Sequence, residues 1–417
     1  MKEYFNEPME TMPVAELASW QDAQVRHYVA HAYEHAPAMR RIMEAAGVAP
    51  GAIRGVGDLA AIPITRKDEL IELQRASPPF GGFLGIRPGT AKRFFLSPGP
   101  LFDPEGSRPD YWRWAQALYA AGFRSGDIVQ NTAAYHRTPL GFMFDEALQQ
   151  LGCAVVPAGP GDTETQLQII RELGVTGYTG VPSYLMTLIE RAEEMGWKWQ
   201  QETRLRKAFL AAEPFPPSLR QAFRRRGIEF GEGYGTAETG NLGFSCSENR
   251  GWHIPYDVVV QVVDINSGEP LGHGVEGEIV VTLLDETYAL IRFGTGDLSA
   301  LNTEPCPCGR TTPRLVGWLG RVGQAVKVRG MFVHPRQLAA VLNDVEGVAR
   351  YQAVVTRDGH RDELTILIES EPETAPDTTA LREALEQTIK LRVNLSVVAP
   401  GTIPEEAEAL ADRRTWE

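Results

Sequence analysis

The sequence predicts an α/β protein with a large N-terminal region, built on a mostly parallel sheet, and a small α+β domain at the C-terminus. Between residues 111 and 195, segments with helical periodicity alternate with short β-rich segments, which is typical of a parallel sheet covered by helices. From 258 to 292 the β-rich segments follow one another without helices, which indicates an antiparallel region. After Arg321 the pattern of helical and β-rich segments begins anew, which predicts a separate folding unit of about 95 residues.

The expected elements of the large region follow from periodicity. Residues 13–46 should form a helix with Val25 and Val29 on its buried stripe, and residues 66–106 an irregular stretch rich in proline and glycine. The further helices are expected at 111–121, 142–151, 164–173 and 184–195, and the strands at 127–131, 153–157, 175–181, 258–265, 278–284 and 289–292.

Residues 323–417 are expected to form an independent domain. Strands at 351–356 and 364–368 flank an Asp-Gly pair at 358–359, which is a strong hairpin signal, and a helix at 379–391 follows. Residues 1–322 then form the large domain, in which about 240–320 is a β-rich subdomain that carries the candidate metal ligands described below.

Charge and composition favour a small-molecule partner. The chain has 417 residues, and its 41 Lys and Arg against 54 Asp and Glu give a net charge of −13. Proteins that bind nucleic acid without sequence preference do so by neutralising phosphates, so this balance argues against a nucleic-acid partner. No apolar run approaches the roughly 18 residues of a membrane helix, and the N-terminus lacks the apolar core of a signal peptide. We expect a cytoplasmic protein with no membrane partner.

Three of the four cysteines indicate a metal site. Cys246 lies near His253 in sequence, and Cys306 and Cys308 form a tight C-x-C pair in a glycine-flanked loop. Three thiolates and one imidazole suit a closed, tetrahedral, structural zinc site. Spacing alone leaves open that these are unrelated thiols and a surface histidine. Cys153 lies in an apolar run and is expected in the core.

Four short motifs follow one another along the chain. They are Ala-Ala-Glu-Pro at 211–214, Tyr-Gly-Thr-Ala-Glu at 234–238, Thr-Gly-Asp at 295–297 in a turn that ends a strand, and Gly-Arg at 320–321. Each is weak alone, but in this order and spacing they resemble the adenylate-forming (AMP-binding) superfamily, specifically its phenylacetate–coenzyme A ligase branch. Residues 59–70, 126–131 and 306–310 extend the likeness over nearly the whole chain.

The resemblance implies an adenylate-forming fold, with a large N-terminal domain of several subdomains and a small mobile C-terminal one. In that family ATP and a carboxylic acid form an acyl-adenylate, and coenzyme A then displaces AMP to give a thioester. The implied ligands are therefore ATP or AMP, Mg²⁺, coenzyme A and an aryl or acyl carboxylic acid. The branch has zinc-type ligands at the cysteine and histidine positions above. A homodimer is left open.

The resemblance also implies roles for single residues. Tyr234 would stack on adenine, Asp297 would accept hydrogen bonds from the ribose hydroxyls, and Glu238 would hold Mg²⁺. Glu238 and Arg321 are the candidate catalytic residues, with Arg321 on the ribose or phosphate side. The expected nucleotide-binding residues are Ala212, Glu213, Pro214, Tyr234, Gly235, Thr236, Asp297 and Arg321. Without the resemblance, Asp297 and Glu238 are equally compatible with turn and cap chemistry.

An apolar pocket for the acid is expected near Tyr135, His136 and Phe142, where His136 is equally compatible with an ordinary loop histidine.

One departure from the family lies in its phosphate loop, which reads Ser-Ser-Gly-Thr-Thr-Gly-x-Pro. The matching residues 97–104 read Ser-Pro-Gly-Pro-Leu-Phe-Asp-Pro. Pro98 and Pro100 have no N–H to donate, and Asp103 adds a negative charge where an anion should bind. A hinge aspartate is also replaced, by Gly323.

A second departure is the missing C-terminal lysine, which in the family stabilises charge during adenylation. Lys390 is the last lysine here, and the later cations are all arginines, of which Arg413 and Arg414 lie nearest the C-terminus. We therefore expect a phenylacetate–CoA ligase-like protein whose ATP-dependent adenylation is impaired. The alternative is a catalytically degenerate relative that binds nucleotide, CoA or acyl-adenylate without ATP turnover.

Overall fold

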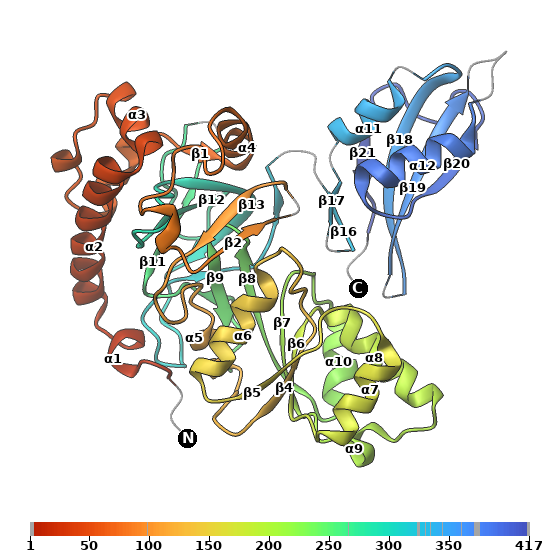
Figure 1. Ribbon diagram of the computed structural model, residues 1–417, viewed down its shortest axis with the longest axis horizontal. Coiled ribbons are helices and arrows are strands. Elements are labelled where there is room, and N and C mark those ends of the chain that lie inside the picture. Colours follow the sequence, from red (N-terminus) through yellow and green to blue (C-terminus); the bar gives the residue numbers. More distant parts are fainter. Residues whose placement is uncertain are drawn as a thin grey trace. The chain divides into compact units, whose positions relative to one another are not determined.

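The chain folds into two compact units, one of residues 1–215 and 219–322 and the other of residues 323–417 with 216–218 (Figure 1). The computed structural model describes residues 4–97, 99–265, 267–322, 326–329, 331–333, 335–343, 345–359, 361–370 and 376–414. The expected Gly323 hinge and Pro98 of the loop lie outside these residues.

The N-terminal helix is interrupted where one continuous helix was expected. Helices α1 (Glu7–Glu10), α2 (Val14–His35) and α3 (Pro37–Ala45) follow one another, with α2 and α3 separated at Ala36. Ala36 is extended, with φ −107° and ψ 100°, because a residue before proline avoids the α-helical region. The buried stripe through Val25 and Val29 is confirmed. Two 3₁₀ helices, η1 (Pro50–Ala52) and η2 (Val56–Ala61), follow.

The centre of the large unit is a parallel sheet in the order β5-β4-β6-β7-β8. Its strands are β4 (Ile128–Asn131), β5 (Ala154–Pro157), β6 (Gly177–Gly180), β7 (Lys207–Leu210) and β8 (Glu229–Thr236). Helix α5 (Ala115–Ala120) precedes β4, and the helices between the strands are α6 (Leu140–Gln150), α7 (Thr163–Glu172), α8 (Pro182–Glu194), α9 (Trp199–Glu202) and α10 (Pro217–Arg225). The expected alternation of helices and strands is confirmed.

Both faces of this sheet are buried, since successive side chains of a strand point to opposite faces. Val129 and Phe209 pack in a cluster with residues of α5 and α6. Ala208 and Leu210, the neighbours of Phe209, pack in another cluster with residues of α7, α8 and α10. Figure 1 shows α6 apart from the α7, α8 and α10 group. The parallel sheet is therefore a rigid centre whose strand ends position the site.

An antiparallel region continues the sheet beyond β8. Strands β9 (Gly240–Ser245), β10 (Trp252–His253), β14 (Arg314–Leu315), β13 (Phe293–Asn302), β12 (Glu276–Leu283) and β11 (Val258–Val263) follow in that spatial order. Two short strands, β1 (Thr65–Arg66) and β15 (Gly320–Arg321), also pair with β13. Residues of α2, α3 and α4 (Lys67–Ala76) pack with β11, β12 and β13 in one core cluster.

Two expectations for this region are wrong. Residues 289–292 form no strand, and β13 begins at Phe293, because Arg292 has a left-handed φ of 53° that breaks an extended run. Residues 295–297 lie inside β13 rather than in a turn at its end. Gly296, with φ 74°, lies where the pairing of β12 with β13 shifts register, so its neighbour Asp297 is presented from a bulge.

The stretch 66–106 is more regular than expected. It contains the helix α4, a 3₁₀ turn η3 (Pro88–Thr90) and a hairpin of β2 (Arg93–Leu96) with β3 (Phe102–Glu105). Glycine and proline concentrate outside α4, at the turns, so the irregular composition hid a ten-residue helix.

The small unit is an α+β domain with a sheet in the order β20-β19-β18-β21. The expected hairpin is confirmed, as β18 (Val348–Asp358) pairs antiparallel with β19 (Arg361–Ser370). Its other elements are β16 (Val326–Val328), β17 (Met331–Val333), α11 (Pro335–Leu342), α12 (Thr378–Ile389), β20 (Asn394–Val398) and β21 (Leu410–Asp412). Among the described residues no helix is both long and apolar enough to cross a membrane.

Candidate functional site

Asp297 is the centre of a group of hydrogen-bond donors. The Tyr234 hydroxyl donates to Asp297 Oδ2 at 2.8 Å, and Trp318 Nε1 donates to Oδ1 at 3.2 Å. Arg321 Nε donates to Oδ1 at 2.8 Å. Burial, and next the Asp297 charge, raise the pKa of Tyr234 well above its ordinary value, so its hydroxyl keeps its proton. The structure thus brings together Tyr234, Asp297 and Arg321, which the motifs singled out.

Two tryptophans complete this group, and sequence reasoning missed both. The ring of Trp252 stacks on Tyr234, with centroids 5.7 Å apart and planes 7° apart. Trp318 is 40% exposed and keeps its indole N–H on Asp297. The one signal for Trp318 was its position two residues before the Gly-Arg motif, and Trp252 gave no signal beyond its place beside His253.

The 211–214 segment lies beside the Tyr234 strand. Ala212 has φ 69° and follows β7, which pairs in parallel with β8 through Leu210 and Glu232. The carboxyl ends of neighbouring parallel strands share one edge of a sheet, where ligands of open α/β folds bind. Glu213 accepts a hydrogen bond from Ser183 Oγ at 2.6 Å. Neighbouring strand ends therefore carry two of the predicted nucleotide-binding segments.

Glu238 faces a lysine that sequence reasoning did not assign. Lys67 Nζ lies 2.6 Å from Glu238 Oε1, and the Glu238 side chain is 0% exposed. Burial raises the pKa of Glu238, but the charge and hydrogen bond of Lys67, with Thr236, outweigh it and lower that pKa. An Mg²⁺ ion takes carboxylate oxygens at about 2.0–2.1 Å and keeps several waters, so the described surroundings of Glu238 do not fit it. The signal for Lys67 was its place in the 59–70 segment.

Asp103 lies against the same pair. Its side chain is fully buried, and neither carboxylate oxygen accepts a hydrogen bond from a described residue. Burial, followed by the charge of Glu238, raises the pKa of Asp103 well above its ordinary value, and Lys67 offsets this in part. Asp103 belongs to β3, and its side chain points into the protein. The match to the family's phosphate loop predicts instead that Asp103 faces a ligand phosphate, so this expectation is wrong.

The segment that matches the phosphate loop is the tip of the β2–β3 hairpin. The Ser97 N–H donates to the Leu101 carbonyl at 2.8 Å, and the Ser97 hydroxyl donates to it at 3.3 Å. Gln74 of α4 donates to the Phe102 carbonyl at 2.9 Å and accepts from the Phe102 N–H at 2.8 Å. These donors are directed at protein acceptors, whereas an anion-binding loop turns its N–H groups toward the ligand.

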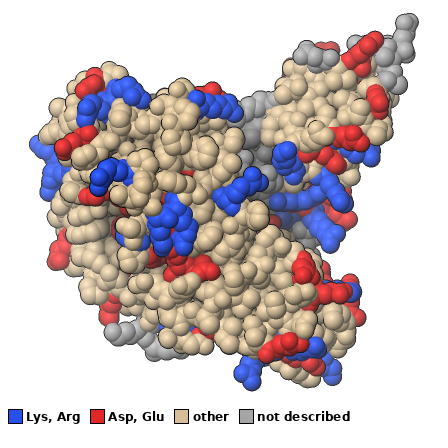
Figure 2. Space-filling view, viewed as in Figure 1, with Lys and Arg blue, Asp and Glu red and all other residues tan. Residues whose placement is uncertain are grey.

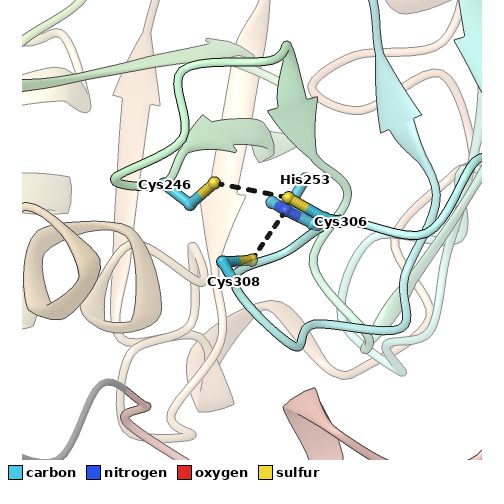
Figure 3. A group of neighbouring side chains, drawn as sticks. All are labelled: Cys246, His253, Cys306 and Cys308. Carbon is cyan, nitrogen blue, oxygen red and sulfur yellow. Dashed lines mark hydrogen bonds between the residues drawn. The ribbon is translucent and has the colours of Figure 1, made fainter.

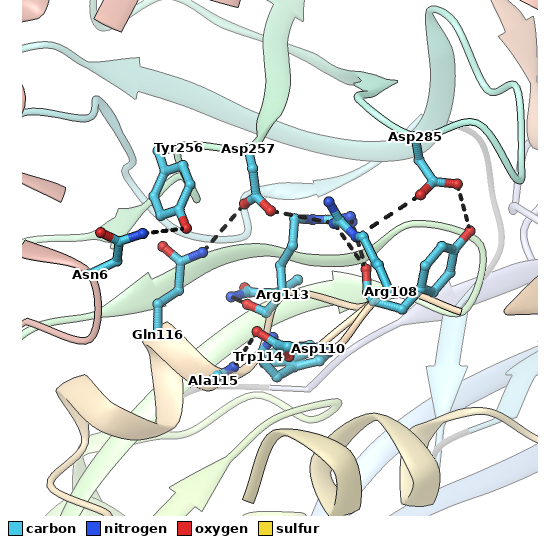
Figure 4. A network of polar contacts seen from close by, with 12 residues as sticks. Asn6, Arg108, Asp110, Arg113, Trp114, Ala115, Gln116, Tyr256, Asp257 and Asp285 are labelled. Carbon is cyan, nitrogen blue, oxygen red and sulfur yellow. Dashed lines mark hydrogen bonds and ion pairs between the residues drawn. The ribbon is translucent and has the colours of Figure 1, made fainter. Parts of the chain in front are cut away.

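Polar contacts from the segment after β3 hold the β8–β9 turn, in which Glu238 lies. Figure 4 shows the part of this network around Arg108, Arg113 and Asp257. Arg113 donates to the Thr239 carbonyl, and Asn241 Nδ2 donates to the Arg113 carbonyl at 2.9 Å. Arg108 pairs with Asp257 at 3.3 Å. The segment after β3 therefore fixes the backbone next to Glu238.

Asp110 also lies in this segment and is only partly exposed. Its carboxylate accepts the N–H groups of Trp114 and Ala115 at 2.9 and 3.0 Å, at the start of α5 (Figure 4). Burial raises the pKa of Asp110 to about 7, although these two N–H groups lower it in part. This carboxyl group is therefore protonated in the folded protein over a range in which an ordinary aspartate is charged.

Two of the three expected acid-pocket residues touch. The rings of Tyr135 and Phe142 meet edge to face, with centroids 5.2 Å apart. The Tyr135 hydroxyl donates to Asp145 at 2.7 Å and accepts from Asn131 Nδ2 at 2.8 Å, which fixes its ring. His136, the third expected residue, is exposed.

The four predicted metal ligands converge in a buried cluster (Figure 3). Their ligand atoms all lie within 4.8 Å of one another, with Cys246 Sγ 3.7 Å from Cys306 Sγ and Cys308 Sγ 3.3 Å from His253 Nε2. A tetrahedral zinc with bonds of about 2.3 Å to sulfur separates two sulfurs by about 3.8 Å. His253 Nδ1 lies 3.3 Å from the Thr312 carbonyl, which orients Nε2 toward the thiols. The residues therefore fit zinc.

The C-terminal arginines differ in their surroundings. Arg414 is 3% exposed at its side chain and pairs with Asp362 at 2.8 Å and with Asp412. Arg413 Nη2 lies 3.5 Å from the Gln352 side-chain oxygen. Arg414 is thus part of a buried ion-pair group of the small unit.

Comparison with known proteins gives the family. The AMP-binding enzyme model matches residues 125–282, and the model of the AMP-binding enzyme C-terminal domain matches residues 330–414. The phenylacetate-coenzyme A ligase of Thermus thermophilus is 35% identical, over 95% of this chain and 95% of the relative. The chain belongs to the AMP-binding enzyme family. The resemblance expected from its motifs is confirmed.

Further relatives of this AMP-binding enzyme carry the same description. The phenylacetate-coenzyme A ligase of Aromatoleum evansii is 31% identical, over 99% of this chain and 98% of its own. Among solved structures, a 2-hydroxyisobutyryl-CoA ligase in complex with 2-HIB-AMP and CoA superposes with a TM-score of 0.89 at 24% identity, covering 99% of this chain and 93% of that chain. The amide bond synthetase McbA of Marinactinospora thermotolerans gives 0.57 at 16%, covering 92% of each. The two structures share the fold, and the expected fold class is confirmed.

Proposed function

We propose that this AMP-binding enzyme forms a CoA thioester from an aryl- or acyl-adenylate, and that its own ATP-dependent formation of that adenylate is impaired. In the proposed step the CoA sulfur bonds to the acyl carbon while the bond from that carbon to the bridging adenylate oxygen breaks. AMP leaves with the electron pair, and the thiol proton passes to solvent. ATP or AMP and CoA are the proposed ligands, as expected for relatives described as CoA ligases.

The observation that carries the proposal is the contrast between two parts of the site. On the adenosine side, Asp297 is held by three donors. A carboxylate offers about four acceptor positions, so one remains for a ribose hydroxyl. On the phosphate side, the Ser97 and Phe102 N–H groups are used within the protein. An acyl-adenylate, with its single phosphate, suits this arrangement better than a triphosphate.

The surroundings of the C-terminal arginines also support an impaired adenylation step. Removing one preorganised charge from an active site commonly lowers turnover by about 10²–10³. Arg414 is bound to Asp362 and Asp412, and the fork of an arginine is no equivalent of a lysine ammonium. We therefore propose that neither Arg413 nor Arg414 replaces the family lysine.

The acid is proposed to lie against Tyr135 and Phe142. Their edge-to-face pair offers an apolar wall of fixed shape, which suits an aryl or acyl group. His136 remains a predicted neighbour of that pocket. A cytoplasmic location and a homodimer stay predictions of the sequence.

The test separates the two half-reactions. Synthetic phenylacetyl-adenylate with CoA is expected to yield phenylacetyl-CoA and AMP, whereas phenylacetate with ATP is expected to release little pyrophosphate. The Thermus thermophilus relative, assayed alongside, is the positive control. Pyrophosphate release as fast as that of the relative would overturn the impairment, and absence of thioester from supplied adenylate would overturn the transfer activity.

The second candidate is a binding protein without turnover, favoured by the inward-directed Ser97 donors. Isothermal titration with AMP, CoA and phenylacetyl-adenylate distinguishes it, since it binds these ligands without producing thioester.

We also propose that the four-residue cluster holds a structural zinc. It has four protein ligands and no open position, and a closed site of this kind stabilises the fold rather than supplying chemistry. Cys246 belongs to the loop after β9, and Cys306 and Cys308 to the loop after β13, so zinc would tie the strand that carries Asp297 to β9 of the same sheet.

A further inference from the structure

We propose that the Lys67 ammonium is a built-in counter-ion that takes the place of a divalent cation beside Glu238, so that this enzyme binds its adenylate ligand without Mg²⁺. This rests on the proposed function, because the adenylate is the ligand it concerns. The inference starts from the 2.6 Å ion pair between Lys67 Nζ and Glu238 Oε1.

The backbone holds Lys67 in this position. Thr65 and Arg66 pair in parallel with Phe293 and Gly294 of β13, and Lys67 is the first residue of α4. Its side chain is 23% exposed and runs toward the hairpin tip, since a Cβ placed on Gly99 would lie 3.5 Å from Lys67 Cε. The lysine side chain is therefore positioned by β1 at its start and lies beside Gly99 of the hairpin tip.

The buried acidic groups beside Lys67 are stabilised by a positive charge at its position. Glu238 is 0% exposed, and a buried carboxylate is unfavourable unless it is paired. Asp103, also 0% exposed, adds a second carboxyl group whose oxygens accept no hydrogen bond from a described residue. Lys67 acts electrostatically on both. Among the described residues, Glu238 and Asp103 thus share one neighbouring cation, Lys67.

An ammonium and a divalent cation exclude each other here. Mg²⁺ requires octahedral coordination with oxygens at about 2.0–2.1 Å, and it keeps several waters. Lys67 Nζ already occupies the approach to Glu238 Oε1, and a second cation on that oxygen would be strongly repelled. A lysine ammonium is a compact point charge with three donors, so it can balance Glu238 where the metal would otherwise be required.

A fixed ammonium beside Glu238 would give the site a preference among ligands. A triphosphate carries several charges that a bound divalent cation normally neutralises, whereas the single phosphate of AMP or an acyl-adenylate needs no such ion. A site with a fixed ammonium and no room for Mg²⁺ therefore selects the monophosphate ligand. Lys67 becomes a specificity-determining residue for adenylate over ATP.

The first arm of the test uses the wild-type protein. AMP is titrated calorimetrically in EDTA and in Mg²⁺, and the affinity is expected to change by less than about twofold. Mn²⁺ binding is followed by electron paramagnetic resonance, with no stoichiometric site expected that depends on Glu238. A Mn²⁺ site in the wild type that Glu238→Gln removes would overturn the proposal, as would AMP binding that requires Mg²⁺.

The second arm uses Lys67→Met, with Lys92→Met as the matched control. Lys92 also lies against a buried carboxylate, at 3.4 Å from Glu105, but outside the Glu238 pocket. Lys67→Met is expected to gain one Mn²⁺ site that the added Glu238→Gln change removes, and Lys92→Met is expected to gain none. A folded Lys67→Met without the new site, or an equal gain in both variants, would overturn the proposal.

The two arms separate this inference from the proposed function. If Lys67→Met does not fold, the wild-type arm alone decides. If the wild type binds neither AMP nor phenylacetyl-adenylate in either buffer, the proposed function fails. The Mn²⁺ titrations without nucleotide still decide whether Lys67 excludes the cation.

Discussion

Arg321 and Asp297 face each other directly across two paired strands, and Arg321 Nε lies 2.8 Å from Asp297 Oδ1. The pairing of β15 with β13 sets this distance, so the backbone itself positions the guanidinium. Both side chains are nearly buried, at 14% and 7% exposed, so solvent screens the pair only weakly. The carboxylate proposed to bind ribose is thereby held in one orientation before any ligand arrives.

Arg321→Ala should weaken AMP binding by about tenfold or more, since removal of one partner from a nearly buried ion pair leaves Asp297 poorly oriented. Isothermal titration measures the change. Arg357→Ala is the control, because Arg357 makes a similarly buried pair with Asp362 at 2.9 Å in the small unit. An equal loss of AMP affinity in both variants would show that the effect is general destabilisation.

Loss of a metal ligand should destabilise the large unit. Cys308→Ala is expected to abolish bound zinc, measured by elemental analysis after dialysis, and to lower the unfolding temperature markedly, since a structural zinc contributes folding free energy directly. Cys153→Ala, a buried cysteine outside the cluster, serves as the control and should keep the metal. Wild-type protein that is metal-free and equally stable would refute the zinc proposal.

Asp110 should give the stability a pH dependence of known sign. Its folded pKa of about 7 exceeds that of the unfolded chain, so the folded state binds the extra proton between about pH 4 and 7. The stabilisation is fully present below the unfolded pKa and is lost as pH rises through the folded one, by up to about 1.4 kcal/mol per pH unit.

Urea unfolding of wild type and Asp110→Asn, followed by tryptophan fluorescence across this range, measures that dependence. The stability of the wild type relative to the variant should fall as pH rises, and the two should run parallel below about pH 4. A difference that stays constant up to pH 8 would contradict the raised pKa.

Gln74 should hold the hairpin tip in place. Gln74→Ala removes both hydrogen bonds to Phe102 and a third to the Tyr288 hydroxyl at 3.1 Å, and leaves buried groups unpaired. A loss of about 1–3 kcal/mol is expected for unfolding of the large unit. Gln168→Ala, which removes one exposed contact with Glu172, should change stability by less than about 0.5 kcal/mol. Similar losses in both variants would argue against this role.

Much of the fold was readable because the sequence repeats a simple pattern. Helices and strands alternate between 111 and 195, and β4 and β6 bury both of their faces, so periodicity and short length sufficed. The predicted strand at 289–292 was wrong because an apolar, β-rich composition does not reveal the left-handed φ that Arg292 adopts. Helix α4 was hidden because the turns around it dominate the composition.

Site residues could be predicted where the residue type itself implies a chemical role. They were harder to predict where tertiary contacts alone determine the role of a residue. Three cysteines and His253 have few roles besides metal binding, and they do converge. The residue type of Lys67 implies no particular chemistry, because lysines are common on the surface of any soluble protein. The contact depends on tertiary structure. Thr65 pairs with Phe293, and this pairing places Lys67 beside Glu238, which is distant in the sequence.

The two-residue strand β1 has a consequence for how this site tolerates change. A slip of one residue in its pairing with β13 would move the chain by about 3.3 Å and turn the next side chain to the opposite side. The ammonium would then leave Glu238, although no residue of the pocket had been altered. An insertion or deletion just upstream of Thr65 would therefore act as a mutation of the ligand site, transmitted through two peptide units.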